Sequence, residues 1–397
     1  MKLIERPIYM NKLKSVLGVP DIKIITGIRR CGKSKLMEAF IDYIRKTDES
    51  ANIILINFSD MEFEALKEYH KLNAYINERY NPEKNNYLFI DEVQLCSGFE
   101  LVLNSVHSSG KYDIYVTGSN AFLLSSDLAT LFTGRTFSIE VYPFSLVEFM
   151  EYYNLSDRYA AYTQYRSVGG MPGAYVYPDE NSRFSYLREV FDTLIIRDII
   201  QKYGIRNRPL LEKITDYLMD NISNIVSPSK IADTLVSSKF PTNNKTVSTY
   251  VDYLCRAFGF CRIRRYDVRG KKYLTSSDKY YMTDPIFRQA RLGSRMPDFG
   301  RVSENLVALE LKRRGYEVYA GVLYKKEIDF VAIRRNEKIY IQVSEFIDSP
   351  ETFEREYAPL LAIKDAFPKL ILASTRQEMY VYEGIIIKDI ADWLCEA

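Results

Sequence analysis

The stretch Gly27-Ile28-Arg29-Arg30-Cys31-Gly32-Lys33-Ser34 decides the fold of the N-terminal part of the chain. It fits the pattern GxxxxGK(S/T) at every specified position, and it lies between an apolar run and a stretch of helical periodicity. Glycines allow backbone N–H groups to wrap a phosphate, and the first turn of a helix adds positive potential there. We therefore predict a phosphate-binding loop; the alternative is a glycine-rich turn that only caps a helix.

Side chains of this loop are expected to bind a nucleotide. Lys33 is predicted to reach the β- and γ-phosphate oxygens, and Ser34 to ligate Mg²⁺. Arg29 and Arg30 occupy variable positions, where they either contact phosphate or stay solvated. The predicted nucleotide-binding residues are Gly27, Arg29, Arg30, Cys31, Gly32, Lys33, Ser34 and Lys35.

A nucleoside triphosphatase also needs a carboxylate at a strand end to hold Mg²⁺ through water. Asp91 and Glu92 follow the run Tyr87–Ile90, and Asp91 comes 58 residues after Lys33. We predict Asp91 on the metal side and Glu92 as the general base or water-positioning group. An Asp-Glu pair at such a place is otherwise the solvated start of a loop.

Two more positions are candidates for sensing the γ-phosphate. Asn120, with Ser119 second, follows another predicted strand; the alternative is an ordinary turn. Arg135 precedes the predicted strand Phe137–Val141 and is a candidate arginine finger or sensor, because a guanidinium stabilises the charge of a phosphoryl transition state. A surface arginine is the alternative. If Arg135 acts in trans, the chain forms a homo-oligomer.

Residues 1–145 alternate short β-branched runs with amphipathic stretches, the pattern of a parallel sheet joined by helical crossovers. The predicted fold class is α/β, with a P-loop NTPase core of parallel sheet flanked by helices. Predicted strands are Ile22–Thr26, Ile53–Phe58, Tyr87–Ile90, Ile114–Thr117 and Phe137–Val141, and predicted helices are Lys33–Arg45, Glu64–Arg79 and Phe99–Ser108.

Three segments are predicted to follow this core. Residues 146–209 form a helical connector that breaks at Gly169–Gly173, because glycine and proline interrupt a helix there. Residues 210–295 form a winged helix, in which a helix-turn-helix precedes a hairpin. Residues 296–397 form a small αβββαβ domain.

The hairpin region is strongly basic. Between Arg256 and Arg295, 11 Lys or Arg stand against 3 Asp, so this segment carries +8 while the whole chain carries +2. Interleaved aromatic residues predict a buried face and a basic face that is free for phosphates. The second hairpin strand is predicted at Lys271–Thr275. We expect nucleic acid, DNA in particular, as a partner; the alternatives are a solvated hairpin or a dock for an acidic surface. The predicted contacts are Arg264, Arg265, Lys271 and Lys272.

Composition excludes several classes of protein. Among 397 residues, 54 Lys plus Arg balance 52 Asp plus Glu, which excludes a polybasic protein as a whole. Five Cys without a CxxC pair and two isolated His argue against a zinc cage or a disulfide framework. No run approaches the roughly 18 apolar residues of a membrane span, so we expect a cytosolic protein without a membrane partner.

These motifs resemble the AAA-type ATPases of bacteria and archaea that carry a C-terminal region named DUF4143. The resemblance implies an ATP-binding core, ATP rather than GTP, and a C-terminal module similar to the PD-(D/E)xK nuclease fold. It rests on GIRRCGKS (27–34), YLFIDEVQ (87–94), VTGSNAFLL (116–124), FTGRTFSIEVYPFSLVEF (132–149), VGGMPGAY (168–175), LIIRDII (194–200), YDVRGKKYLTSSDKYYMTD (266–284) and EIDFVAIRRNEKIYIQV (327–343).

The implied nuclease fold needs carboxylates around Mg²⁺ and, on the third strand, the pattern Glu-x-Lys, in which the lysine orients water. Glu304 and Asp329 match two acid positions. Gln342 and Ser344 stand where an acid and a lysine are required. We therefore expect a degenerate site, Glu304, Asp329 and Gln342, that serves binding or assembly rather than cleavage.

The sequence is compatible with three functions. The leading hypothesis is an ATPase with ATP and Mg²⁺ as cofactors, whose cycle is coupled to nucleic acid held by the C-terminal half. The second is a slow nucleotide-dependent switch that acts on a protein partner. The third, an ATP-dependent nuclease, is disfavoured by Gln342 and Ser344.

Overall fold

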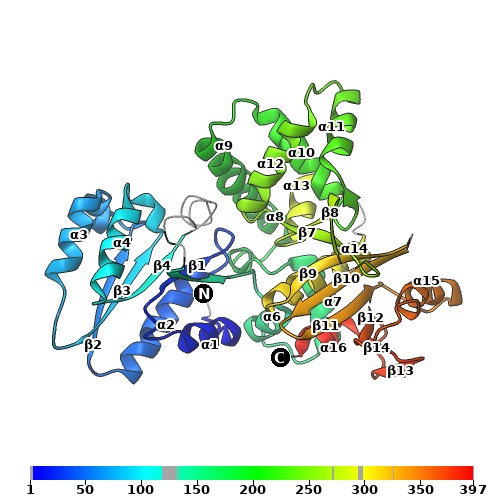
Figure 1. Cartoon of the computed structure of the whole chain (residues 1–397), viewed down its shortest axis with the longest axis horizontal. Helices are drawn as coiled ribbons and strands as arrows, with labels where there is room; N and C mark the ends of the chain where they lie inside the picture. Colours follow the sequence, from blue (N-terminus) through cyan, green and yellow to red (C-terminus); the bar gives the residue numbers. More distant parts are fainter. Residues whose placement is uncertain are drawn as a thin grey trace. The chain divides into compact units, whose positions relative to one another are not determined.

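The structure is a computed structural model that describes residues 3–118, 132, 134–270, 272–293, 298–324 and 326–396 (Figure 1). The predicted sensor Asn120, its neighbour Ser119 and the basic residue Lys271 lie outside these residues. The chain divides into two compact units, Met1–Tyr142 and Pro143–Ala397. Among the described helices, none is both long and apolar enough to cross a membrane.

Unit 1 is built on a five-stranded sheet in the order β2-β3-β4-β1-β5, and every neighbouring pair is parallel. This confirms the predicted α/β fold, and each predicted strand is found to within two residues. The elements of unit 1 are α1 Pro7–Ser15, β1 Ile22–Thr26, α2 Lys33–Thr47, β2 Ala51–Asn57, η1 Met61–Leu66, α3 Tyr69–Glu78, β3 Asn85–Asp91, η2 Val93–Leu95, α4 Phe99–Ser109, β4 Asp113–Thr117 and β5 Thr136–Glu140.

Helices cover both faces of this sheet, and every residue of β1 is buried (Figure 1). Side chains of α3 and α4 pack on one face, where Leu72, Ile76 and Val106 join a cluster of strand residues. On the other face, Phe40 of α2 contacts the rings of Phe89 and Tyr115. The five strands therefore end together along one carboxyl edge, where the phosphate loop is found.

One predicted helix of unit 1 is divided in two. Instead of a helix over Glu64–Arg79, a 3₁₀ segment ends at Leu66 and α3 begins at Tyr69. The side chain of Glu68 accepts hydrogen bonds from the amides of His70 and Lys71, both at 3.1 Å. Because a side chain that caps these amides starts a new helix, the periodic pattern alone overestimated the length of α3.

Unit 2 contains helices and a nine-stranded mixed sheet in the order β13-β14-β12-β11-β10-β9-β7-β8-β6. Its elements are α6 Leu146–Tyr153, α7 Arg158–Val168, η3 Pro172–Ala174, α8 Glu180–Glu189, the π-helix η4 Val190–Ile196, α9 Arg197–Tyr203, α10 Arg208–Asp220, β6 Ile225–Val226, α11 Pro228–Ser237, α12 Asn244–Arg256, β7 Phe260–Asp267, β8 Lys272–Met282, α13 Ile286–Leu292, α14 Phe299–Arg313, β9 Glu317–Leu323, β10 Lys326–Arg334, β11 Glu337–Val343, α15 Pro350–Leu361, β12 Lys369–Ala373, β13 Tyr380–Tyr382, β14 Ile385–Asp389 and α16 Ile390–Cys395.

The hairpin and the C-terminal strands share this one sheet. Strand β7 pairs in parallel with β9, from Arg264 beside Tyr319 to Asp267 beside Val322. The pairing covers the edge of β9 that a separate C-terminal domain would leave open. The boundary that the sequence predicts near residue 295 falls between two strands, β7 and β9, that are hydrogen-bonded in one sheet.

The C-terminal elements follow the predicted order αβββαβ, formed by α14, β9, β10, β11, α15 and β12. Strands β13 and β14 and helix α16 come after them and were not predicted. Strand β8 is also longer than predicted, because it continues past Thr275 to Met282. This extension carries Lys279 into the interior of unit 2, where it is 2% exposed.

The glycine-rich break at Gly169–Gly173 is a site of close packing. Helix α7 ends at Val168, as predicted from the glycine and proline content. A Cβ atom on Gly170 would lie 2.5 Å from the carbonyl oxygen of Phe144, and one on Gly173 would lie 2.0 Å from the hydroxyl of Tyr186. Glycine is therefore required here for close approach of neighbouring groups.

Candidate functional site

The predicted phosphate loop lies at the carboxyl end of β1 and leads directly into α2. Gly27 has φ +140°, and a Cβ atom there would lie 2.1 Å from the carbonyl oxygen of Val141, so only glycine fits. Gly32 has φ +101° and immediately precedes Lys33, the first residue of α2. Lys33 is buried, and its ammonium group donates to the carbonyls of Gly27 at 3.1 Å and Ile28 at 3.2 Å. The ammonium group thus lies against the loop that is expected to hold phosphate.

Two buried groups hold the back of this loop. Cys31 is fully buried, its Sγ donates to the carbonyl of Val141 at 3.3 Å, and burial raises the pKa of its thiol. Arg6 donates to the carbonyls of Cys31 at 3.1 Å and Tyr142 at 2.8 Å. The side chain of Cys31, predicted to contact nucleotide, therefore packs toward β5. Arg6 was missed because it lies 25 residues before the position that it supports.

The remaining basic side chains of the loop are more exposed. Arg29 is half-buried and Arg30 is exposed, with φ 66°. Lys35 is exposed and forms an ion pair with Glu38 at 2.5 Å on the outside of α2. The side chain of Lys35 is thus engaged along its own helix, whereas the orientation of α2 still directs the first amides of the helix toward the loop.

The predicted acids lie at the end of β3, beside the loop. Asp91 is buried, burial raises the pKa of its carboxyl group, and the neighbouring Ser34 side chain acts against this rise. The hydroxyl of Thr117, at the end of β4, also donates to Asp91 and accepts from the amide of Glu92 at 3.1 Å. A serine and a carboxylate that lie beside one another are the donor set that Mg²⁺ takes beside a bound nucleotide. The residues therefore fit both ATP and Mg²⁺.

Glu92 has a strained backbone, and its side chain is held in place by a hydrogen bond. Its φ and ψ of 54° and 48° are left-handed, which costs a residue with a side chain on the order of 1–3 kcal/mol and is typical of functional sites. The amide of Gln94 donates to the Glu92 carboxylate. Sequence reasoning missed both Gln94 and Thr117. A polar residue at the end of a strand, next to the predicted acids, was the available signal for Thr117.

Arg135 lies at the amino end of β1, whereas the phosphate loop of the same chain lies at the carboxyl end of that strand. Its carbonyl accepts from the amide of Ile22 at 2.9 Å, at the amino end of β1. Gly27 is five residues further along, which is about 16 Å at roughly 3.3 Å per residue. This distance argues against a sensor role toward the nucleotide of the same chain. The exposed Arg135 side chain remains a candidate arginine finger toward a neighbouring copy.

The predicted degenerate nuclease residues come together in unit 2. Glu304 Oε1 accepts from Lys279 at 2.7 Å and from the hydroxyl of Tyr281 at 2.6 Å. Asp329 lies 3.6 Å from the same ammonium group, and burial and the nearby Glu304 raise the pKa of Asp329 to about 8. The amide oxygen of Gln342 accepts from the backbone of Asp329 at 2.7 Å. The sequence thus predicted the acids of this centre but not the lysine at its middle.

Much of the basic charge near the hairpin is paired within unit 2. Arg264 is exposed and Arg265 is half-buried, both on β7. Of the four predicted contacts, Lys272 begins β8 and Lys271 lies outside the described residues. The expected face of free basic groups is therefore smaller than its sequence count. The internal pairs are Arg256 with Asp252 (2.7 Å), Arg262 with Asp278 (3.7 Å), Lys279 with Glu304 (2.7 Å), Arg288 with Asp220 (3.4 Å) and Arg291 with Asp216 (2.7 Å).

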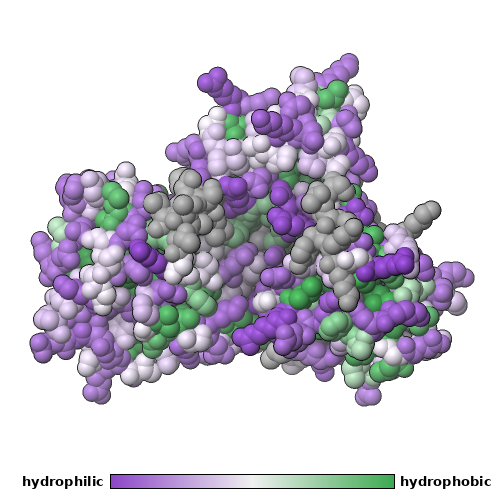
Figure 2. Space-filling view, viewed as in Figure 1, coloured by the Kyte–Doolittle hydropathy of each residue, from purple (hydrophilic) through white to green (hydrophobic). Residues whose placement is uncertain are grey.

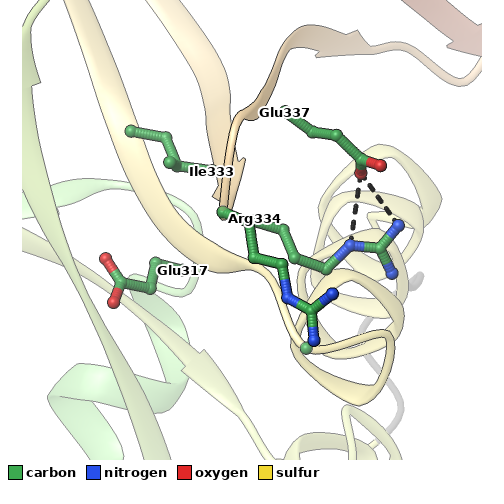
Figure 3. Close-up of a pocket in the computed structure, with 6 residues that line it drawn as sticks. Glu317, Ile333, Arg334 and Glu337 are labelled. Carbon is green, nitrogen blue, oxygen red and sulfur yellow. Dashed lines mark hydrogen bonds and ion pairs between the residues drawn. The ribbon is translucent and has the colours of Figure 1, made fainter.

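A separate hollow of about 710 Å³ lies where β9 and the β10–β11 turn meet (Figure 3). Glu317, Ile333, Arg334 and Glu337 are among its lining residues. Arg334 donates to Glu337 at 2.8 and 3.2 Å and to the carbonyl of Arg314 at 3.0 Å. Since this guanidinium is satisfied by the protein itself, we assign the hollow no ligand.

The fold and the loop define unit 1 as an AAA-type domain of the P-loop class. A family model described as an AAA domain matches residues 19–150, and a model described as a domain of unknown function, DUF8612, matches residues 159–298. The resemblance to DUF4143 proteins is thus not supported for this segment. The chain is 36% identical over 400 residues to an uncharacterized protein of Haemophilus influenzae, with 99% of each covered, and it belongs to the same family as that protein.

More distant relatives and solved structures are also similar. An uncharacterized protein of Methanocaldococcus jannaschii is 28% identical, over 92% of this chain and 84% of that protein. The Aeropyrum pernix ORC1 protein, solved in complex with DNA, gives a TM-score of 0.33 at 12% identity, over 77% of this chain and 93% of that one. AMPPCP-bound DnaA from Aquifex aeolicus gives 0.32 at 18%, over 62% and 85%. Such scores indicate nothing about what this chain binds.

Proposed function

We propose that this chain is an ATPase that binds ATP and Mg²⁺ at Gly27–Ser34 and hydrolyses ATP with Asp91 and Glu92. The observation that carries the proposal is a chain of hydrogen bonds at the carboxyl edge of the sheet. Ser34 lies beside Asp91 and acts against the rise that burial causes in the pKa of its carboxyl group. Thr117 joins that carboxylate to the amide of Glu92. The metal-side groups and the base are thereby fixed relative to one another beside the loop.

Each residue of this arrangement has a defined task. Lys33 exchanges two neutral carbonyl partners for phosphate oxygens, and Glu92 accepts a proton from the attacking water. Ser34 would hold Mg²⁺ directly and Asp91 would hold it through water; the bound ion would neutralise charge on the phosphates. Arg135 supplies an arginine finger to a neighbouring copy, which makes the active form an oligomer.

We propose further that the cycle is coupled to nucleic acid, DNA in particular. Helices α11 and α12 precede the β7–β8 hairpin in the order of a winged helix. Helices α9 to α12 present a mostly hydrophilic surface (Figure 2). Arg264 and Arg265, with Lys271 and Lys272, are the proposed phosphate contacts. We place the protein in the cytosol, which agrees with five cysteines that form no disulfide.

The ATPase proposal is tested by steady-state phosphate release from ATP and Mg²⁺, with GTP as a parallel substrate. Lys33→Ala and Glu92→Gln control for contaminating activity, and each is expected to lower turnover by at least about 100-fold. Single- and double-stranded DNA and RNA are then added in turn. Turnover that persists in both variants would remove the ATPase assignment.

The nucleic-acid proposal has its own measurement. Affinity for duplex DNA is expected to fall steeply with salt and to drop when Arg264 and Arg265 are both changed to Ala. Arg334→Ala, which removes a cation already paired with Glu337, is the matched control and should leave affinity unchanged. No binding at low salt would exclude nucleic acid as the partner, while leaving the ATPase assignment intact.

A second candidate function is a slow nucleotide-dependent switch that acts on a protein. The observation in its favour is β13, the outermost strand of the nine-stranded sheet. Its residues Tyr380, Val381 and Tyr382 are 40%, 61% and 45% exposed, and hydrophobic residues gather over α15 and β12–β14 in Figure 2. An exposed apolar edge strand is suited to pairing with another chain. Turnover that no nucleic acid stimulates would favour this function.

A further inference from the structure

The polar centre of unit 2 contains a cation that the chain itself supplies. The ammonium group of Lys279, on β8, donates to Glu304 Oε1 at 2.7 Å and pairs with Glu327. It lies 3.6 Å from Asp329 Oδ1. The side chain of Lys279 is 2% exposed. Three carboxylates from α14 and β10 thus converge on one buried ammonium group.

Carboxylates are the ligands of divalent cations, and the predicted nuclease-like order of elements implies such a cation here. Mg²⁺ takes oxygen ligands at about 2.0–2.1 Å. The Lys279 nitrogen lies 2.7 Å from Glu304 Oε1 and 3.6 Å from Asp329 Oδ1. A metal ion bound by both of these acids would therefore overlap the ammonium group. Gln342 adds no charge, since its amide donates to Glu356 at 3.0 Å. The residues present do not fit a divalent cation.

We propose that the Lys279 ammonium replaces the divalent cation of this centre and closes it to metal. The C-terminal strands then do not cut nucleic acid. Their acids instead hold β8, and with it the β7–β8 hairpin, against α14 and β10. This inference concerns a centre in unit 2 and does not depend on ATP hydrolysis in unit 1.

The strand around Lys279 is fixed, so the lysine is built into the centre. The hydroxyl of Tyr281, two residues on and on the same face, donates to Glu304 at 2.6 Å. Asn305 forms hydrogen bonds with both the amide and the carbonyl of Met282, at 2.8 Å each. The neighbouring carboxylates raise the pKa of Lys279 well above its usual range, so the group stays charged.

The same arrangement accounts for the residue at the position of the missing lysine. A cation delivered from β8 leaves no need for a second one on β11. Ser344 occupies that place, and its hydroxyl donates to the carbonyl of Phe346 at 2.9 Å. The cation of this centre thus comes from a residue that lies 65 positions before Ser344, outside the αβββαβ elements.

The test is the number of Mn²⁺ ions bound by the full chain without nucleotide, counted by electron paramagnetic resonance during a MnCl₂ titration. The wild type, Lys279→Met and Lys279→Met/Asp329→Asn are compared, so that any Mn²⁺ held elsewhere is common to all three. We expect Lys279→Met to bind one ion more than the wild type, and the double variant to lose it. Mn²⁺ at 100 times its dissociation constant should raise the Tm of Lys279→Met by roughly 5 °C or more.

Three results would overturn the proposal. The first is a Mn²⁺ ion on the wild type that Asp329→Asn removes, or plasmid cutting by the wild type that Asp329→Ala abolishes. The second is a folded Lys279→Met variant that gains no ion. The third applies if Lys279→Met does not fold in the absence of metal. In that case, failure of Mn²⁺ to restore the circular dichroism of the variant on refolding contradicts the proposal.

Discussion

The two units each contain a buried lysine beside acidic groups, and the two lysines have opposite surroundings. Lys33 in the phosphate loop donates to two neutral carbonyls. Lys279 in the C-terminal centre faces Glu304, Glu327 and Asp329. Carbonyl partners carry no formal charge, so that an anionic phosphate can replace them. Carboxylate partners compensate the positive charge, so that an anion gains nothing by entering, and the ammonium group occupies the place that a metal ion would take.

A buried lysine near acids therefore indicates a reactive site only when its hydrogen-bond partners are neutral groups that a substrate can replace. From composition alone, both regions have the residue types of a catalytic centre. The difference lies in the hydrogen-bond partners: the ammonium group of unit 1 donates to neutral carbonyls next to a helix start, whereas that of unit 2 donates to carboxylates in an ion cluster. The expected effects of mutations therefore differ in kind between the two regions.

The largest effect should come from exchanging each lysine for methionine. Lys33→Met should lower ATP turnover at least about 100-fold and change stability little, because it removes bonds to neutral carbonyls only. Lys279→Met should leave turnover in place and lower the free energy of unfolding by about 3–5 kcal/mol, because buried carboxylates lose their cation. Phosphate release and urea unfolding measure both effects. Equal loss of stability in the two variants would contradict the distinction.

The next effect tests the close approach at the start of the loop. Gly27→Ala should abolish nucleotide binding, because its Cβ atom would lie 2.1 Å from the carbonyl oxygen of Val141 and would push the loop from β5. Gly18→Ala is the matched control: Gly18 also has a positive φ, of 74°, but no atom within 4 Å of the added Cβ. It should cost about 1–2 kcal/mol of stability through backbone strain and keep nucleotide binding. Titration with a fluorescent ATP analogue separates the two.

A smaller effect is expected at Gln94, which holds the carboxylate of Glu92. Gln94→Ala should lower kcat roughly tenfold and leave the KM for ATP nearly unchanged, because a base that is less well placed affects the chemical step and not binding. Gln94→Glu would place a like charge beside Glu92 and should be worse. If Gln94→Ala raises KM and leaves kcat alone, the residue contributes to nucleotide binding instead.

The sequence predicted the parts of the molecule that depend on local pattern. The strands of unit 1 and the residues of the phosphate loop follow from periodicity and spacing, because the loop, its strand and its helix are contiguous. The partners of Arg6 and Lys279 did not follow, because they depend on which distant strands become neighbours. Lys279 was counted in a basic face, since a longer β8 and its place beside α14 are tertiary facts that no local window contains.

The smallest effect concerns pH and the charge balance of the C-terminal centre. Asp329 is faced by Lys279 on β8, Glu304 on α14, Glu327 on its own strand and Glu356 on α15. Its pKa of about 8 in the folded state lies above the ordinary 3.8. A raised pKa favours the protonated folded form, so this stabilisation is complete below about pH 4 and is lost as the pH rises through 8. The free energy of unfolding should therefore decline less steeply between pH 4 and pH 8 in Asp329→Asn, by about 1 kcal/mol or more across the range. Asp298→Asn, at an exposed helix start, is the control and should keep the full decline. An unchanged decline in Asp329→Asn would mean that the proton resides on another acid of the centre.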